Sequence, residues 1–126
     1  MSWHGNECLR IDLVFDRYRD TSIKESTRNQ RTKNQRAIRK DISGREIPVP
    51  QNWPNFLACP INKSDNADFI SEQIKLLKEI FSKVIVTSGG FKDELEVWSS
   101  KDNIDITKLS STHEEADTRL ILHAIN

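Results

Sequence analysis

Two short runs of strand-forming residues most constrain the fold of this chain. Residues 9–15 (LRIDLVF) alternate at first and end in a continuous apolar triplet, and residues 84–87 (VIVT) are almost entirely β-branched. Both patterns predict strands, near residues 11–15 and 84–87, that are buried along part of their length. Between them, apolar side chains recur at helical spacing after Ser64, which predicts a helix over residues 65–81. Because a helix followed by a buried strand is typical of α/β layering, we expect an α/β domain with a short central sheet.

The end of the chain predicts a helix that begins with several acidic residues. Thr112 and Glu115 have the spacing of a capping box, and helical periodicity continues over residues 113–125. Carboxylates crowd the expected first turn, on Glu114, Glu115 and Asp117. A helix start favours negative charge, so capping and solvated surface are one explanation. Because one capping Glu would suffice, the other interpretation is a site for a hard cation such as Mg²⁺.

Asp16 is a further candidate ligand, because it directly follows the apolar end of the first expected strand. In open α/β sheets, a carboxylate at that place reaches the ligand crevice. The alternative is an ordinary Asp that begins a turn. On the expected helix, Glu114 and Asp117 share a face, whereas Glu115 and Asp117 converge only at the helix entry. Both pairings stay open.

Charge divides the chain into a basic arm and an acidic body. Residues 17–45 carry ten Lys or Arg against three acids, whereas residues 46–126 carry eight against thirteen. The arm is too poor in apolar residues to bury a face, so we expect it to protrude at about residues 20–40. Phosphate neutralisation would then drive binding to nucleic acid. The predicted phosphate contacts are Lys24, Arg28, Arg31, Lys33, Arg36 and Arg39.

Other interpretations of the arm are a solvated helix, a disordered linker or a nuclear-import signal. After the arm, residues 46–63 form a connector rich in Pro, in which Trp53, Phe56 and Leu57 are expected to anchor the chain on the core. A further short strand is expected at residues 94–98, and residues 104–106 are a candidate for another.

Composition limits the class of protein. With 36% hydrophobic and 30% charged residues, the chain has no run approaching the ~18 apolar residues of a membrane span. The first residues lack the basic-then-apolar order of a signal peptide. Cys8 and Cys59 have no metal-ligand spacing, so we expect reduced thiols and no disulfide-linked partner. These features favour an intracellular protein, nuclear or cytoplasmic.

Several separated motifs resemble a group of animal proteins, many of them derived from mobile elements. The most specific is the Glu-Glu-Ala-Asp-Thr-Arg string at residues 114–119. More loosely, the order of motifs is similar to the flap endonuclease branch of the PIN-like nucleases. That order is a Val-Phe-Asp strand end at 14–16, a Lys/Arg-rich arch, and a Glu-x-acid motif that opens a helix. The motifs that carry the resemblance further are at residues 13–18, 22–24, 27–28, 52–57, 62–63 and 113–119.

This resemblance implies a three-layer PIN-like domain and a Mg²⁺ or Mn²⁺ cofactor. Carried over by position, Asp16, Glu115 and Asp117 would be catalytic metal ligands, with Glu114 as an alternative ligand or cap. The family also has an Asp on an earlier strand and an Asp-x-Asp motif on a later one, and this chain contains neither. The resemblance therefore implies a partial domain over residues 1–126, with an arm (17–45), a connector (46–63) and an α/β body (64–126).

The resulting expectation is a partial Mg²⁺-dependent nuclease domain that acts on nucleic-acid phosphodiesters with little or no activity of its own. The alternative is a non-catalytic module, derived from a mobile element, that binds nucleic acid or another protein. In a module that binds protein, the basic arm and the acidic body would attract each other within or between chains. A zinc peptidase is disfavoured, because His113 and Glu114 lack the second His of a His-Glu-x-x-His helix.

Overall fold

The computed structural model of the chain describes residues 9–17, 38–113 and 115–126. In chain order, the elements are β1 (Arg10–Val14), α2 (Trp53–Leu57), α3 (Pro60–Leu76), η2 (Lys78–Ile80), β2 (Val84–Ser88), β3 (Val97–Ser99), η3 (Ile106–Leu109) and α4 (Ala116–Ile125). No helix in these ranges is both long and apolar enough to cross a membrane.

The strands form one sheet in the order β1-β2-β3. β1 and β2 are parallel, with Ile11 opposite Ile85, and β3 pairs with β2 in the antiparallel direction. Parallel neighbours need a long crossover, and α2 and α3 lie in this connection. The two apolar runs therefore lie side by side in one sheet, and the predicted α/β class is confirmed for a small three-stranded sheet. The predicted burial of the first strand is wrong, because every residue of β1 is half-buried or exposed.

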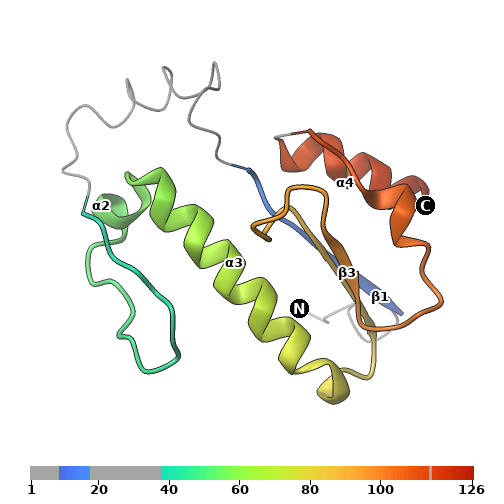
Figure 1. Cartoon of the computed structure of the whole chain (residues 1–126), viewed down its shortest axis with the longest axis horizontal. Coiled ribbons are helices and arrows are strands. Elements are labelled where there is room, and N and C mark those ends of the chain that lie inside the picture. The colour runs from blue at the N-terminus through green and yellow to red at the C-terminus, as the bar shows by residue number, and fades with distance from the viewer. Residues whose placement is uncertain (1–8, 18–37, 114) are drawn as a thin grey trace, which may run out of the picture.

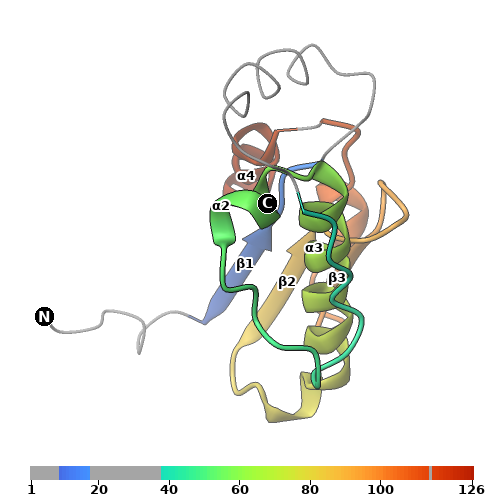
Figure 2. The same ribbon diagram turned by 90° about the vertical axis from the view of Figure 1, so that its left-hand side faces the viewer.

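Helices cover both faces of the sheet. α3 lies on one side and α4 on the other, and the two perpendicular views agree on this arrangement (Figures 1 and 2). The core on the sheet is small: Val86, Val97 and Leu109 are buried together, with Val84 and Ile104 packed against them. Because β1 and β2 are parallel, their carboxyl ends meet at the same edge of the sheet. α4 begins beside this edge, where a hydrogen bond joins it to Asp16.

The long helix begins earlier than predicted. We expected a helix over residues 65–81, but α3 runs from Pro60 to Leu76, and η2 continues it as a separate short turn. Pro60 occupies the first helical turn, where its fixed φ fits and its missing N–H has no helical partner to lose. Part of the connector is also helical, since α2 lies within residues 46–63. Of its expected anchors, Phe56 is buried, but Trp53 and Leu57 are 42% and 44% exposed.

Two predicted strands are corrected. β3 covers Val97–Ser99 instead of residues 94–98, because Asp93 and Leu95 form a turn in which the Asp93 carboxylate accepts the Leu95 N–H. Residues 104–106 are not a strand. The Asp105 carboxylate instead accepts the Thr107 N–H and caps the 3-10 helix η3.

The described end of the basic arm packs against α3. Asn62 is 1% exposed and binds this segment with its whole amide. Its Nδ2 donates to the carbonyl of Ile38, and its Oδ1 accepts from the Lys40 N–H and from the Arg39 guanidinium. Arg39 also forms an ion pair of 2.6 Å with Asp65. Residues 38–40 therefore do not protrude, and the rest of the expected arm, residues 18–37, lies outside the described residues.

Candidate functional site

Asp16 lies at the N-terminal end of α4, one hundred residues away in the sequence. Its Oδ1 accepts the backbone N–H of Ala116 at 2.7 Å. Ala116 is the first residue of α4 and stands between Glu115 and Asp117. The structure thus brings the end of β1 to the start of the acidic helix. Asp16, Glu115 and Asp117 are all exposed there.

The start of α4 differs from the predicted capping box. The helix begins at Ala116 instead of residue 113, and its N-cap is Glu115, whose side chain makes no capping hydrogen bond. Asp16, two residues after the end of β1, supplies the hydrogen-bond acceptor instead, and Thr112 lies outside the helix start. The local pattern correctly indicated a capped acidic helix, but it could not reveal that the cap comes from β1.

Arg119 lies beneath this contact and ties the same two segments together. It is 1% exposed, and its guanidinium donates to the carbonyl oxygen of Phe15. Gly89 makes room for it: this residue has φ +82°, and a Cβ there would overlap both the Arg119 guanidinium and the Phe15 carbonyl. Residue 89, directly after β2, therefore has to be glycine so that the Arg119 guanidinium can bind the Phe15 carbonyl at the end of β1.

The pKa of Arg119 is lowered to about 10. The main cause is burial, which removes the guanidinium from water, and the positive charge of Arg17 acts in the same direction. The carboxylate of Asp16 opposes both. Arg17 is itself 8% exposed and lies 3.4 Å from the carboxylate of Glu94. Asp16 thus lies at an edge of the sheet where two buried guanidinium groups are already engaged by the Phe15 carbonyl and by Glu94.

A cavity of about 350 Å³ opens next to Asp16. It lies between the end of β1, the end of α2 and the first half of α3. Its lining residues are Phe15, Asp16, Leu57, Lys63, Asn66 and Ala67. An apolar floor with a few polar groups is the usual make-up of a small-ligand site.

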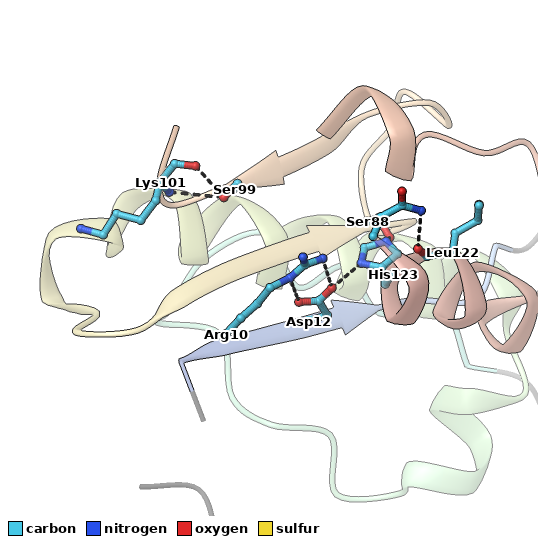
Figure 3. Close-up of polar contacts among 8 residues, drawn as sticks. Arg10, Asp12, Ser88, Ser99, Lys101, Leu122 and His123 are labelled. Atoms are coloured by element: carbon cyan, nitrogen blue, oxygen red, sulfur yellow. Dashed lines mark hydrogen bonds and ion pairs between the residues drawn. The ribbon is translucent and has the colours of Figure 1, made fainter. Parts of the chain in front are cut away.

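A second polar cluster fixes the other half of α4 to the sheet (Figure 3). His123 Nδ1 lies 2.7 Å from Asp12 Oδ2, and His123 Nε2 lies 3.0 Å from Ser88 Oγ. Arg10 donates two hydrogen bonds to the Asp12 carboxylate, at 2.7 and 2.6 Å. Burial acts to raise the pKa of Asp12, but the hydrogen bonds from Arg10 and His123 outweigh it and hold the pKa below its usual value.

The order Ser, His, Asp is that of a hydrolase triad, but the burial excludes this use. Ser88 is 1% exposed, so its hydroxyl is not accessible to a substrate. The cluster instead gives both ring nitrogens of the buried His123 a hydrogen-bond partner. Sequence reasoning missed it, although a charged residue within an apolar strand, Asp12, was a usable signal.

The other predicted site residues divide into two groups. Glu114, Lys24, Arg28, Arg31, Lys33 and Arg36 lie outside the described residues. Arg39 is described, and its guanidinium binds Asn62 and Asp65. Within residues 9–17, 38–113 and 115–126, no three His, Cys, Asp or Glu side chains gather closely enough to hold a metal ion. Cys59 is a free thiol.

Comparisons with protein-family models, with curated proteins and with solved structures find no match to this chain. The PIN-like resemblance and the metal and nucleic-acid roles of the named residues therefore stay predictions.

Proposed function

We propose that this chain is a partial Mg²⁺-dependent nuclease domain of the PIN-like class. It acts on nucleic-acid phosphodiesters at the carboxyl edge of β1 and β2. The single observation that carries the proposal is the 2.7 Å hydrogen bond between Asp16 and the Ala116 N–H. It unites two acidic segments that the sequence separates by a hundred residues, at the edge where open α/β sheets bind ligands.

The described carboxylates suit a cation that is shared with the substrate. Mg²⁺ commonly takes only one or two protein carboxylates and completes its shell with waters and phosphate oxygens. Asp16 uses Oδ1 for the helix cap, so its second oxygen can bind a cation. Asp117 lies in the first turn of the same helix. A two-metal site would need further carboxylates, and for this reason we expect weak cleavage or none.

Each residue at the edge has a role in this proposal. Asp16 and Asp117 hold the cation, which when bound polarises the phosphoryl group and lowers the pKa of a bound water. Glu115 is the alternative ligand at the helix entry. Arg119 is a positioning residue, because its hydrogen bond to the Phe15 carbonyl fixes the backbone from which Asp16 projects. Lys63 lies on the rim of the adjacent cavity and contributes positive charge for phosphate.

The test is Mn²⁺ binding by electron paramagnetic resonance, together with cleavage of labelled single-stranded and flap oligonucleotides. Asp117→Asn removes a ligand charge while it preserves shape, and we expect it to weaken Mn²⁺ binding at least about tenfold. The matched control is Asp102→Asn, at an exposed position in the loop between β3 and η3, which should leave binding unchanged. Equal affinity of the two variants would remove the metal site from the proposal.

A second function is favoured by a specific observation: Asp16 already serves as a helix cap, and the described residues hold no cluster of three metal-ligating side chains. A non-catalytic nucleic-acid-binding module would need only the positive charge. It would bind oligonucleotides in a salt-sensitive manner, and neither Mg²⁺ nor Asp117→Asn would alter the affinity. The same Mn²⁺ titration therefore separates the two functions.

A further inference from the structure

β1 lies at an open edge of the sheet. In the part of the chain that the structure describes, its one neighbouring strand is β2. The Val84 N–H of β2 donates to the Leu9 carbonyl, and the parallel ladder continues through the residues of odd number in β1. Because backbone groups alternate in direction along a strand, the N–H and C=O groups of Asp12 and Val14 point to the open edge. Such an edge is a template for pairing with another strand.

The sequence of β1 is complementary to itself when two copies run in opposite directions. Residues 9–13 are LRIDL, with a basic and an acidic residue placed symmetrically about Ile11. In an antiparallel pair with Ile11 opposite Ile11 of a second copy, Arg10 lies opposite Asp12 on both sides of the axis. Directly opposite charges stabilise a strand pair, and like charges destabilise it. A shift of one strand by two residues would pair Asp12 with Asp12 or Arg10 with Arg10, so charge selects one register.

The two faces of β1 also match those of a second copy. Arg10 and Asp12 point to the face that α4 covers, where Arg10 donates two hydrogen bonds to the Asp12 carboxylate (Figure 3). The opposite face of the strand carries Leu9, Ile11 and Leu13, and all three are exposed. In the same register, Leu9 lies opposite Leu13 of the second copy. The pairing would therefore bury apolar side chains on one face and join opposite charges on the other.

α4 presents apolar side chains to solvent on the same side of the sheet as the charged residues of β1. Arg119 and His123 are buried against the sheet, whereas Leu120, Ile121 and Ile125 are exposed. A surface helix normally shows the reverse pattern, with its apolar stripe on the core. An outward apolar stripe is typical of a helix that another element covers.

Pairing of the two strands would bring the two copies of α4 into contact. His123 contacts both Asp12 of β1 and Ser88 of β2, so α4 lies above the gap between these strands. Across a twofold axis between two β1 strands, these gaps are two strand spacings apart, roughly 9–10 Å. Packed helices have interaxial distances of about 8–10 Å. Leu120 and Ala124 line the groove between β1 and α4 and would meet their counterparts there.

We propose that the chain forms a symmetric dimer, in which β1 pairs in the antiparallel direction with β1 of a second copy. Ile11 lies on the twofold axis, the three described strands of each copy join in one continuous sheet, and the two α4 helices pack on one face of it. Because a twofold interface uses the same surface on both copies, each favourable contact occurs twice. The dimer is independent of the proposed nuclease function, because it uses the lateral edge of β1 and leaves Asp16 outside the interface.

Cysteine cross-linking tests the register. In a chain whose Cys8 and Cys59 are replaced by serine, Ile11→Cys should give a disulfide-linked dimer under mild oxidation. The two Cα atoms of a directly opposite, non-hydrogen-bonded pair are about 4.5 Å apart, within reach of a disulfide. Leu13→Cys is the matched control on the same face. Its two copies are four residues apart along the paired strands, roughly 13 Å, which is too far for a disulfide. The proposal is overturned if Ile11→Cys does not cross-link faster than Leu13→Cys.

Charge at position 11 gives a second test, by sedimentation velocity over a range of protein concentrations. Ile11→Lys places two like charges across the axis, and Ile11→Glu does the same with the opposite sign. We expect each to raise the dimer dissociation constant at least about tenfold. An equal mixture of the two variants places opposite charges across the axis and should restore the dimer. Because Ile11 is exposed, both substitutions are compatible with the fold. A parent chain that is monomeric at every concentration, or a mixture no more dimeric than either variant alone, would refute the dimer.

Discussion

The two halves of α4 are both tied to β1 by polar side chains, but in opposite ways. At the C-terminal half, His123 lies between Asp12 and Ser88, and its side chain is 2% exposed. At the N-terminal end, Asp16 reaches the Ala116 N–H from an exposed position, and Glu115 and Asp117, also exposed, flank Ala116 in the sequence. In the first contact, both His123 ring nitrogens bond to buried or half-buried protein groups, so this contact stabilises the fold. The second faces solvent with more negative charge than a cap requires, as expected of a ligand site.

The largest expected effect comes from breaking the buried half. His123→Ala removes the hydrogen bonds to Asp12 and Ser88 and leaves both polar groups near the sheet without this partner. We expect the free energy of unfolding to fall by about 3 kcal/mol, measured by urea denaturation. His113→Ala, at an exposed position, is the matched control and should change it by less than about 0.5 kcal/mol. Similar costs for both would show that the cluster does not hold α4.

Gly89→Ala tests the connection between the two halves, because this residue makes room for Arg119. The added Cβ would require an unfavourable φ of +82° and would overlap the guanidinium. We expect a loss of about 2 kcal/mol in the free energy of unfolding. At Gly44, where φ is not positive, a Cβ meets only the flexible end of Glu46. Gly44→Ala should therefore cost much less, and an equal cost would contradict the role given to Gly89.

Asp16 variants separate capping from cation binding at the exposed half. Asp16→Ala loses the acceptor for the Ala116 N–H and should cost about 1 kcal/mol of stability in urea denaturation. Asp16→Asn keeps an acceptor oxygen and should cost only a few tenths of that value. Both variants lose the charge, so both should lose Mn²⁺ affinity. If Asp16→Asn binds Mn²⁺ like the parent chain, Asp16 is only a cap.

The smallest expected effect is the pH dependence of the buried half. The pKa of Asp12 is lowered in the folded chain, so its ionised form stabilises the fold above its unfolded pKa of about 4. This contribution should disappear as the pH falls from about 4 through the folded pKa. Comparison of urea midpoints between pH 5 and pH 3 should show a smaller decrease for Asp12→Asn than for the parent chain. Parallel decreases would assign acid sensitivity to other groups.

The fold was predictable wherever the sequence pattern was local. The β-branched run at 84–87 and the alternation at 9–15 identified β2 and β1 to within one residue. The start of α3 was misplaced, because Pro60 could be read as a breaker or as a first-turn residue, and packing decided between them. β3 was misplaced because the alternation of acids and apolar residues at 94–98 begins within a turn that Asp93 closes.

The candidate site was predictable only in part, for a related reason. The sequence showed that Asp16 ends a strand and that acids begin a helix, and it therefore indicated where they would meet. It could not show that Asp16 caps the helix, that Arg119 supports it from below, or that His123 meets Asp12. These contacts span one hundred residues or more, and only tertiary packing creates them. The burial of Asn62 was missed because it falls in the predicted connector, where a polar residue indicates surface until packing is known.

The most direct measurement of the central claim is broadening of backbone amide NMR signals by trace Mn²⁺, which falls off steeply with distance from the ion. If the exposed half of the contact between β1 and α4 is a cation site, broadening should be strongest at Asp16, Ala116 and Asp117 and should vanish in Asp117→Asn. The contradicting result is broadening centred on Asp65, Asp68 and Glu72, which line a separate groove beside α3, with Asp16 unaffected.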